Sequence, residues 1–394
     1  SLDFYKKQSL TLSAQLSREE RAFAKTLANG IGTWVKQNPK NASVPEALLL
    51  QARLYVRAED YDRALVTLFK LRKMYPTTDL ALLNPLMADA VLAVNSKNRE
   101  EATALFTAPL PEDAKTPAQR QAQALYALSK LPGRSLYEPA AEAFEEFFAA
   151  NDDYKETDIV ELWYGDLHRS NGNYLAAISQ YKKAGELYPK TPYRAASLRL
   201  IGDIYADNLK DTANAMGTYT QVLREFPGSS ETGIVYKHMA ILDENNKQYD
   251  SALINYDKAI SLLGVTPAAY EAYQGKADVY VKTKNYADAY QTLHKMATVF
   301  SANEKLSTEA LMKAAELARK QMRDQAKYAQ SLEKALLAHP QSAKAPELMY
   351  ELGRAYEQQK NTTQAIAVYR KLVLSRPTDK WASRAQGRLS RLEK

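Results

Sequence analysis

The residue types that most often carry chemistry are present in this chain, but their spacing does not suit a reaction centre. The four histidines are dispersed along the sequence at His168, His238, His294 and His339. None of them stands in the His-Glu-x-x-His spacing that holds zinc on one face of a helix. His168 takes a place that tyrosine has in related segments of the chain, which predicts a packed side chain rather than a metal ligand.

Other catalytic arrangements are also missing. Cysteine is absent, which excludes thiolate nucleophiles and thiolate metal sites. Gly30-x-Gly32 lies inside a predicted helix and lacks the third glycine and the preceding strand of a phosphate-binding loop. The paired acids Asp152 and Asp153 lie at a turn, where carboxylates more often cap a helix than transfer protons. We therefore predict that the chain is not an enzyme and that it holds no metal and no cofactor.

The formal net charge of +7 is unevenly distributed. Acidic residues crowd between positions 140 and 166, whereas basic residues dominate the last predicted helix, which begins at Lys380. A basic end is typical of the solvated cap that a stacked array needs, and contact with nucleic acid or anionic lipid is the alternative. Because no arginine cluster is interleaved with stacking aromatic residues, we predict no nucleic-acid partner.

Tyrosine is unusually frequent, with 26 residues against 9 phenylalanines. Many of these tyrosines stand at regular offsets of a predicted core: Tyr55, Tyr181, Tyr205, Tyr219, Tyr256, Tyr280, Tyr356 and Tyr369. Each ring can fill space between helices while its hydroxyl reaches a polar partner. Core packing is therefore the predicted role of most tyrosines, and a minority is expected to face a partner.

The elements that carry these residues form an internal repeat. One segment reads Gly165, Ala177, Tyr181 and Pro189, and another reads Gly353, Ala365, Tyr369 and Pro377 with the same offsets. Residues that close successive copies stand at 189, 227, 264, 301, 340 and 377. Equal spacing of matched residue types over this distance indicates a repeat array.

Each copy is predicted to form a helix, a short polar turn and a second helix, because apolar residues recur at the 3.6-residue period. The turns have small or polar residues at 58–60, 170–173, 283–285 and 359–361. Small residues at Gly165, Gly202 and Gly353 fit places where one helix lies close against its neighbour. Prolines crowd the stretch 107–139, including the turn from Leu131 to Arg134, which predicts either a degenerate repeat that still stacks or a bend.

This pattern resembles the tetratricopeptide repeat over roughly residues 41–394. The copies exceed the usual period by about three residues, and phrases such as Pro227-x-Ser229 and Pro340-x-Ser342 open the following helix. That longer form resembles a bacterial envelope subset, which includes the barrel-assembly lipoprotein and the coordinator of the Tol-Pal system. The resemblance implies an all-α, right-handed superhelical solenoid of about nine helix-turn-helix repeats with capping helices. We predict four parts: an N-terminal cap or incomplete repeat (1–40), a degenerate arm (41–153), a regular superhelix (154–379) and a C-terminal solvating helix (380–394).

The resemblance also implies a groove lined by the first helix of each repeat. The offsets place nine residues there: Asp166, Arg169, Arg199, Asp203, Lys237, Asp278, Lys282, Tyr350 and Arg354. Their mixed charge suits an extended or helical peptide. The clamp with which co-chaperone members hold a C-terminal carboxylate is not expected, because Asp166 and Asp203 stand where that clamp needs asparagine.

We predict a non-catalytic scaffold that binds a protein or peptide, as part of a periplasmic or outer-membrane complex. The alternatives are the helical arm of a larger envelope enzyme or polysaccharide-export machine, and a cytoplasmic assembly adaptor. No stretch of eighteen apolar residues is present, so membrane association is expected only through an anchor outside this chain. A removed leader or a trimmed chain would each explain the start at Ser1.

Overall fold

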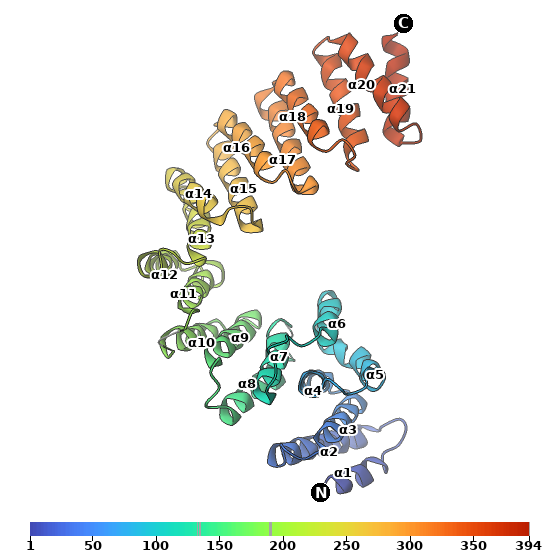
Figure 1. Cartoon of the computed structure of the whole chain (residues 1–394), viewed down its shortest axis with the longest axis vertical. Helices are drawn as coiled ribbons and strands as arrows, with labels where there is room; N and C mark the ends of the chain where they lie inside the picture. The colour runs from blue at the N-terminus through green and yellow to red at the C-terminus, as the bar shows by residue number, and fades with distance from the viewer. Residues whose placement is uncertain (132, 134, 189–190, 394) are drawn as a thin grey trace. The chain divides into compact units, whose positions relative to one another are not determined.

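A computed structural model describes residues 1–131, 133, 135–188 and 191–393. These residues form α-helices, two 3₁₀ turns and two π-helical turns, and they contain no strand (Figure 1). The chain divides into two compact units, Ser1–Thr218 and Tyr219–Lys394, with the division inside helix α12. The predicted all-α class of helix-turn-helix repeats is confirmed.

Unit 1 contains helices α1 to α11 and the first part of α12, which continues into unit 2. Their bounds are α1 Leu2–Ser9, α2 Arg18–Gln37, α3 Val44–Arg57, α4 Tyr61–Met74, α5 Leu80–Ala90, α6 Arg99–Thr107, α7 Pro117–Ser129, α8 Tyr137–Ala150, α9 Thr157–Ser170, α10 Tyr174–Glu186, α11 Arg194–Asp203 and α12 Thr212–Glu225. The short turns of this unit are η1 Val91–Ala93, η2 Ser96–Asn98 and η3 Ile204–Asn208.

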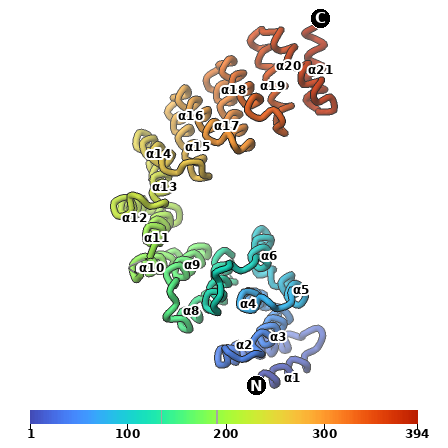
Figure 2. The backbone as a smooth tube through the Cα atoms, in the orientation of Figure 1, coloured from blue at the N-terminus to red at the C-terminus, as the bar shows by residue number. Residues whose placement is uncertain are grey.

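Unit 2 is a run of paired helices that continues to the C-terminal end (Figure 2). Its helices are α13 Glu231–Asn245, α14 Tyr249–Leu263, α15 Pro267–Lys282, α16 Tyr286–Val299, α17 Glu304–Leu317, α18 Gln325–Ala338, α19 Ala345–Gln358, α20 Thr362–Ser375 and α21 Lys380–Leu392, with the π-helical turn η4 at Ala318–Met322. Each helix packs against the next one in sequence.

One turn geometry joins the two helices of seven repeats. A residue with positive φ stands between them in every case: Glu59, Gly172, Lys210, Lys247, Lys284, Arg323 and Lys360. The next residue donates its backbone N–H to a carbonyl of the first helix, as Asn361 does to Tyr356 at 2.8 Å and Asn285 to Tyr280 at 2.7 Å. This left-handed C-cap satisfies carbonyls that the helix end leaves open. The predicted turns at 58–60, 170–173, 283–285 and 359–361 are confirmed.

Two of the repeats contain a π-helical turn just before this cap. Ile204–Asn208 and Ala318–Met322 have the i→i+5 bonding of a π-helix. Ala215 stands 13 residues after Gly202, whereas Ala365 stands 12 residues after Gly353. A π turn takes one residue more than an α turn, so the turn at Ile204–Asn208 takes up this extra residue. The first helix can then keep its packing face although its sequence is longer.

The links between repeats also share a design. Ser229 and Ser342 each donate a backbone N–H to the carbonyl three residues earlier, at 3.0 and 3.1 Å. Their hydroxyls accept the N–H of the residue two positions on, at 3.1 and 3.2 Å. These bonds explain why a hydroxyl two residues after the proline opens the next helix. Pro189, which was expected to close another copy, lies outside the described residues, as do Pro132 and Arg134 of the predicted turn.

Small residues mark close contacts between the two helices of a repeat. A Cβ atom on Gly165 would lie within 3.1 Å of three atoms of the Tyr181 ring, and one on Gly353 within 2.7 Å of three atoms of the Tyr369 ring. Both rings are completely buried. For these two glycines the predicted close approach is confirmed.

Most of the tyrosines singled out in the sequence are core residues. Six of the eight are buried, namely Tyr55, Tyr181, Tyr219, Tyr256, Tyr356 and Tyr369, and the other two are half-buried. His168 is also buried, with its ring against Tyr164 and its Nδ1 3.0 Å from the Tyr137 hydroxyl. The packed role predicted for His168 is confirmed.

The ends of the chain are helical. Ser17 and Glu20 form the reciprocal bonds of a capping box at the start of α2, as the sequence predicts. At the other end α21 buries Ala385 and Leu389. The Arg388 guanidinium of α21 pairs with Glu357 at 2.7 Å, so this basic helix is bound to the last repeat by charge as well as by apolar contact.

The proline-rich stretch departs from the repeat geometry. Helix α5 contains Pro85, α6 is short, and α7 packs against both α4 and α9. The Lys73 ammonium, only 5% exposed, donates to the carbonyls of Leu105 and Ala108 at 2.7 and 2.8 Å and so caps the end of α6. Helices α5 and α6 thus stand outside the stacking of α4 on α7. The four-part division of the chain stays a prediction.

Candidate functional site

The nine residues predicted for a groove lie on five first helices, α9, α11, α13, α15 and α19. Asp166, Arg169, Arg199 and Asp203 belong to unit 1, and the other five belong to unit 2. Asp203 and Lys237 are buried at 3% and 9% exposure, whereas Asp278 and Lys282 are exposed. The others are half-buried.

Several of these side chains form ion pairs inside their own unit. Arg199 pairs with Asp203 one helical turn away. Lys237 meets Glu271 at 2.6 Å, and Arg354 meets Glu351 at 3.3 Å. Charge that the sequence assigns to a partner is therefore partly used inside the protein, within one helix for Arg199 and Arg354 and between α13 and α15 for Lys237.

A cluster of tyrosine, carboxylate and cation occurs three times in the chain, and two of these clusters contain the predicted residues Asp166 and Lys282. The hydroxyls of Tyr181, Tyr256 and Tyr369 donate to Asp166, Glu244 and Glu357, at 2.7, 2.7 and 2.5 Å. Each carboxylate also pairs with a cation from another helix, namely Lys130, Lys282 and Arg388. Burial first, and the adjacent carboxylate second, raise the pKa of all three phenols, which therefore remain hydrogen-bond donors.

The remaining predicted residues have different surroundings. The Tyr350 ring lies 5.2 Å from the Trp381 ring and 6.0 Å from the Tyr369 ring, so it bridges α19, α20 and α21. Arg169 is half-buried on α9. Of the nine predicted residues, Arg354 alone lines the open groove that unit 2 contains.

That groove runs between the first helices α17 and α19 and has a volume of about 770 Å³. Helix α18 forms its floor with Tyr328 and Leu332, which are buried at 6% and 3% exposure. Acidic and basic side chains are equally frequent around it: Glu304, Lys305, Glu309, Lys313, Glu316, Arg319, Lys344, Glu347, Glu351 and Arg354. The mixed charge matches the character expected of a peptide groove.

A charged cluster stands at one end of the groove. The Tyr328 hydroxyl donates to Glu351 at 3.0 Å, and Arg354 pairs with the same carboxylate. The Arg319 guanidinium lies 5.6 Å from the centre of the Tyr328 ring. Burial and the Glu351 charge raise the pKa of Tyr328, so its hydroxyl stays protonated. Arg354 therefore pairs with Glu351, whereas Arg319 lies over the Tyr328 ring.

Two groups in the groove retain unused bonding capacity. The Thr308 side chain is 4% exposed, and its hydroxyl has no hydrogen-bond partner among the described residues. Among the described residues Arg319 forms no ion pair, and its guanidinium lies over the Tyr328 ring. An unpaired buried hydroxyl costs free energy, which a ligand that bonds to it would recover.

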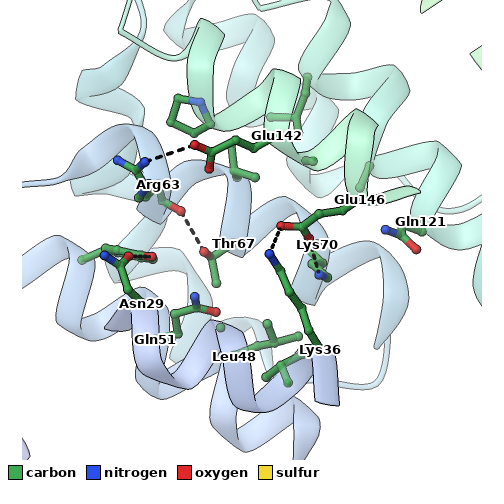
Figure 3. Close-up of a pocket in the computed structure, with 18 of the residues that line it drawn as sticks. Asn29, Lys36, Leu48, Gln51, Arg63, Thr67, Lys70, Gln121, Glu142 and Glu146 are labelled. Carbon is green, nitrogen blue, oxygen red and sulfur yellow. Dashed lines mark hydrogen bonds and ion pairs between the residues drawn. The ribbon is translucent and has the colours of Figure 1, made fainter. Parts of the chain in front are cut away.

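Unit 1 contains a separate cavity of about 360 Å³ between α2, α3, α4, α7 and α8 (Figure 3). Lys36 of α2 and Lys70 of α4 reach Glu146 of α8 from one side of the cavity, at 2.7 and 3.6 Å. On another side Arg63 of α4 reaches Glu142 of α8 at 3.5 Å. Ion pairs thus link α8 to α2 and α4 across the opening.

In Figure 3 the uncharged polar side chains of Asn29 and Gln51 lie on the side of the cavity away from Lys70, below Arg63. Asn29 accepts a bond from the Tyr55 hydroxyl at 2.7 Å, and Gln51 donates to the Ala28 carbonyl at 3.1 Å. Gln51 is buried at 8% exposure. Apolar side chains, including Leu48 and Leu125, complete the lining.

Sequence reasoning missed both concave sites for identifiable reasons. Thr308, Arg319 and Tyr328 belong to a weakly matching copy whose π-helical turn shifts the offsets. The cavity of unit 1 is closed partly by α7 and α8, where the repeat pattern degenerates, so the offsets did not place its residues.

No group of three or more acidic or histidine side chains in the described part of the chain could hold a metal ion. In the same residues no helix combines the length and the apolar character that crossing a bilayer demands. The concave sites are therefore the features that need a functional account.

Comparison with known structures returns other repeat proteins. A tetratricopeptide repeat protein from Parabacteroides merdae is 17% identical, with 70% of this chain and 99% of that chain covered and a TM-score of 0.38. The C-terminal part of a repeat-containing protein from Cytophaga hutchinsonii is 19% identical, with 67% and 95% covered and a TM-score of 0.42. Yeast Tom70 is 16% identical, with 100% and 91% covered and a TM-score of 0.32.

Comparison with curated protein sequences gives no match. Because the TM-scores are low, the assignment depends on family models and on the repeats themselves. One model of the tetratricopeptide repeat matches residues 322–380, and a second matches 46–78 and 196–229. The first of these segments includes part of the groove in unit 2. The chain therefore contains tetratricopeptide repeats in these segments.

Proposed function

We propose that the chain is a non-catalytic scaffold that binds a peptide segment of a partner protein in the groove between α17 and α19. The observation that carries this proposal is the combination of an open concave surface with a buried, unpaired hydroxyl at Thr308 and an exposed guanidinium at Arg319. Tetratricopeptide repeats commonly serve protein interaction, and first helices line this groove.

The chemistry of the groove indicates what the segment contains. An acidic side chain of the partner would pair with Arg319, because Glu351 already shares its charge with Arg354 and the Tyr328 hydroxyl. A backbone carbonyl of the partner would accept a hydrogen bond from the Thr308 hydroxyl. Apolar contact with Leu332 and Met312 would supply affinity that does not depend on salt.

A site-specific photo-crosslinker tests the location. We expect a crosslinking residue in place of Met312 to capture a defined peptide, which mass spectrometry would identify. The matched control is the same residue in place of Leu337, which is 84% exposed on α18 and does not line the groove. Equal capture at both positions would contradict the groove assignment.

Direct binding then tests the chemistry. A labelled synthetic form of the captured segment should bind the full chain in fluorescence anisotropy, and Arg319→Glu should weaken it by at least tenfold through charge repulsion. Lys371→Glu makes the same charge change at an exposed residue of α20 and should leave affinity unchanged. Equal affinities of wild type and Arg319→Glu would count against the proposal.

We further propose that the scaffold acts in the periplasm or at the outer membrane of a bacterium. The support is the long repeat and the proline phrases that open each new helix, which resemble the envelope subset. Fractionation of native cells with an antibody against the chain tests this location. Recovery with the cytosol would rule it out and leave the groove proposal intact.

A further inference from the structure

The cavity in unit 1 presents more positive than negative charge. Three cations border it, Lys36, Arg63 and Lys70, against the two carboxylates Glu142 and Glu146. All of these residues lie in one unit, on α2, α4 and α8. A ligand that enters this space therefore meets an excess of cationic groups.

The excess is concentrated on one side of the cavity. Lys36 and Lys70 share the single carboxylate of Glu146, and only Lys36 comes within hydrogen-bond distance, at 2.7 Å. Lys70 lies 3.6 Å from that carboxylate and donates no hydrogen bond within the described residues, although only 26% of its side chain is exposed. A half-buried ammonium without an acceptor favours a second carboxylate beside it.

The rest of the lining favours an aliphatic body. Val66 and Ala143 are half-buried apolar side chains that border the same space, next to the buried Leu48 and Leu125. The volume of about 360 Å³ is within the range of sites that hold small molecules. A phosphate or another compact dianion would leave this apolar surface without contact.

We propose that the cavity binds a small monocarboxylate with an aliphatic body, with the carboxylate beside Lys70 and Lys36 and the body on Val66 and Ala143. A free acid and an acidic side chain of a partner protein share this chemistry. The site is independent of the groove between α17 and α19, since it belongs to the other unit. In Figure 3 the two lysines and Glu146 lie on one side of the cavity, with space between them and the opposite wall.

Isothermal titration calorimetry of the full chain with octanoate tests this proposal. We expect saturable binding of one octanoate and little binding of octan-1-ol, which has the same body without the charge. Lys70→Met should weaken octanoate binding by about tenfold, the worth of one moderately strong ion pair. Glu146→Gln should strengthen it, because that change removes the carboxylate that competes for both ammonium groups.

The opposite signs of these two variants distinguish ligand binding from a structural role. If the lysines only held α8 in place, both variants would lower the melting temperature and neither would change affinity in this way. Lys40→Met, at an exposed lysine of the same unit, is the matched control and should bind octanoate like the wild type.

The source of the carboxylate is decided by a second ligand. An acetylated, amidated peptide Leu-Leu-Glu-Leu-Leu offers the same group on a protein side chain. Binding of octanoate identifies a free acid as the ligand, and binding of the peptide alone identifies an acidic side chain. The proposal is overturned if neither binds, if octan-1-ol binds as well as octanoate, or if Lys70→Met leaves affinity unchanged.

Discussion

Three buried tyrosines each fill space in the core and also bond to a carboxylate. Tyr181, Tyr256 and Tyr369 fill the space between helices, and their hydroxyls bond to carboxylates that other helices neutralise. Phenylalanine would fill the space but would leave each carboxylate one donor short. This double use explains why tyrosine outnumbers phenylalanine in a chain whose core is not especially polar.

The contact between Gly353 and Tyr369 leads to a prediction about stability. Gly353→Leu would force side-chain atoms into a ring that is completely buried, so we expect the free energy of unfolding to fall by about 1–3 kcal/mol. Urea denaturation followed by circular dichroism measures it. Gly387→Leu on α21 is the control, because nothing lies within 4 Å of a Cβ atom there. A similar midpoint for Gly353→Leu and wild type would show that the repeat register is wrong.

His294 gives unit 2 a defined sensitivity to acid. Burial, helped by the charge of Lys334, lowers the pKa of His294 from 6.5 to about 4, and its Nε2 lies 2.9 Å from the Ser331 hydroxyl. Between these pH values the unfolded chain binds more protons than the folded one, so stability falls as pH drops from about 6.5 to 4. We expect a loss on the order of 2 kcal/mol.

The His294→Gln variant isolates that contribution. Glutamine can keep a bond to Ser331 but takes up no proton, so the variant should lose less stability than the wild type between pH 7 and pH 4.5. Urea midpoints at the two pH values measure the difference. An identical acid loss in both proteins would mean that His294 titrates normally in the fold.

The turn inside each repeat is the element that the chain specifies most consistently. Seven turns place a residue at positive φ, yet six of these residues carry side chains and only Gly172 is glycine. A left-handed conformation costs residues other than glycine about 1–2 kcal/mol, so these caps store a modest strain. The packing of the two helices against each other keeps the turn in this conformation despite the strain.

Lys360→Gly tests this account. Glycine enters the left-handed region freely but loses more entropy on folding, so we expect a net gain of roughly 0.5–1 kcal/mol in the free energy of unfolding. Thermal or urea denaturation measures the change. Gln359→Gly, one residue earlier with φ of −79°, should be destabilising instead. If both variants changed stability in the same direction, strain at residue 360 would not be the cause.

A stacked array should respond to truncation locally. Removal of residues 380–394 deletes the helix that covers the last repeat and pairs Arg388 with Glu357. Because each repeat depends on its neighbours, we expect amide exchange to accelerate first in α19 and α20 and to stay unchanged in unit 1. Hydrogen exchange read by mass spectrometry gives both results. Uniform acceleration over the whole chain would indicate one cooperative block instead.

The candidate sites were less predictable than the fold. Of the residues chosen by offset, Arg354 stands on the first helix α19 and lines the groove of unit 2. The offsets could not show that Lys282 is paired with Glu244 from another helix, because such pairs join residues far apart in sequence. Thr308 was missed for a similar reason: an orphan hydroxyl is recognised only when every possible partner has been located.

The sequence by itself determined the helix-turn-helix repeats, the turns, the capping box at Ser17 and the packed role of His168. These features depend on interactions between residues a few positions apart or on a periodicity that many copies repeat. The tertiary structure alone decided where stacking opens a groove, which charges neutralise one another, and where α8 stands off from α2 and α4 to leave a cavity. Those outcomes depend on the distance between helices that are far apart in the sequence. Small differences in side-chain volume, or one inserted residue, are sufficient to change that distance.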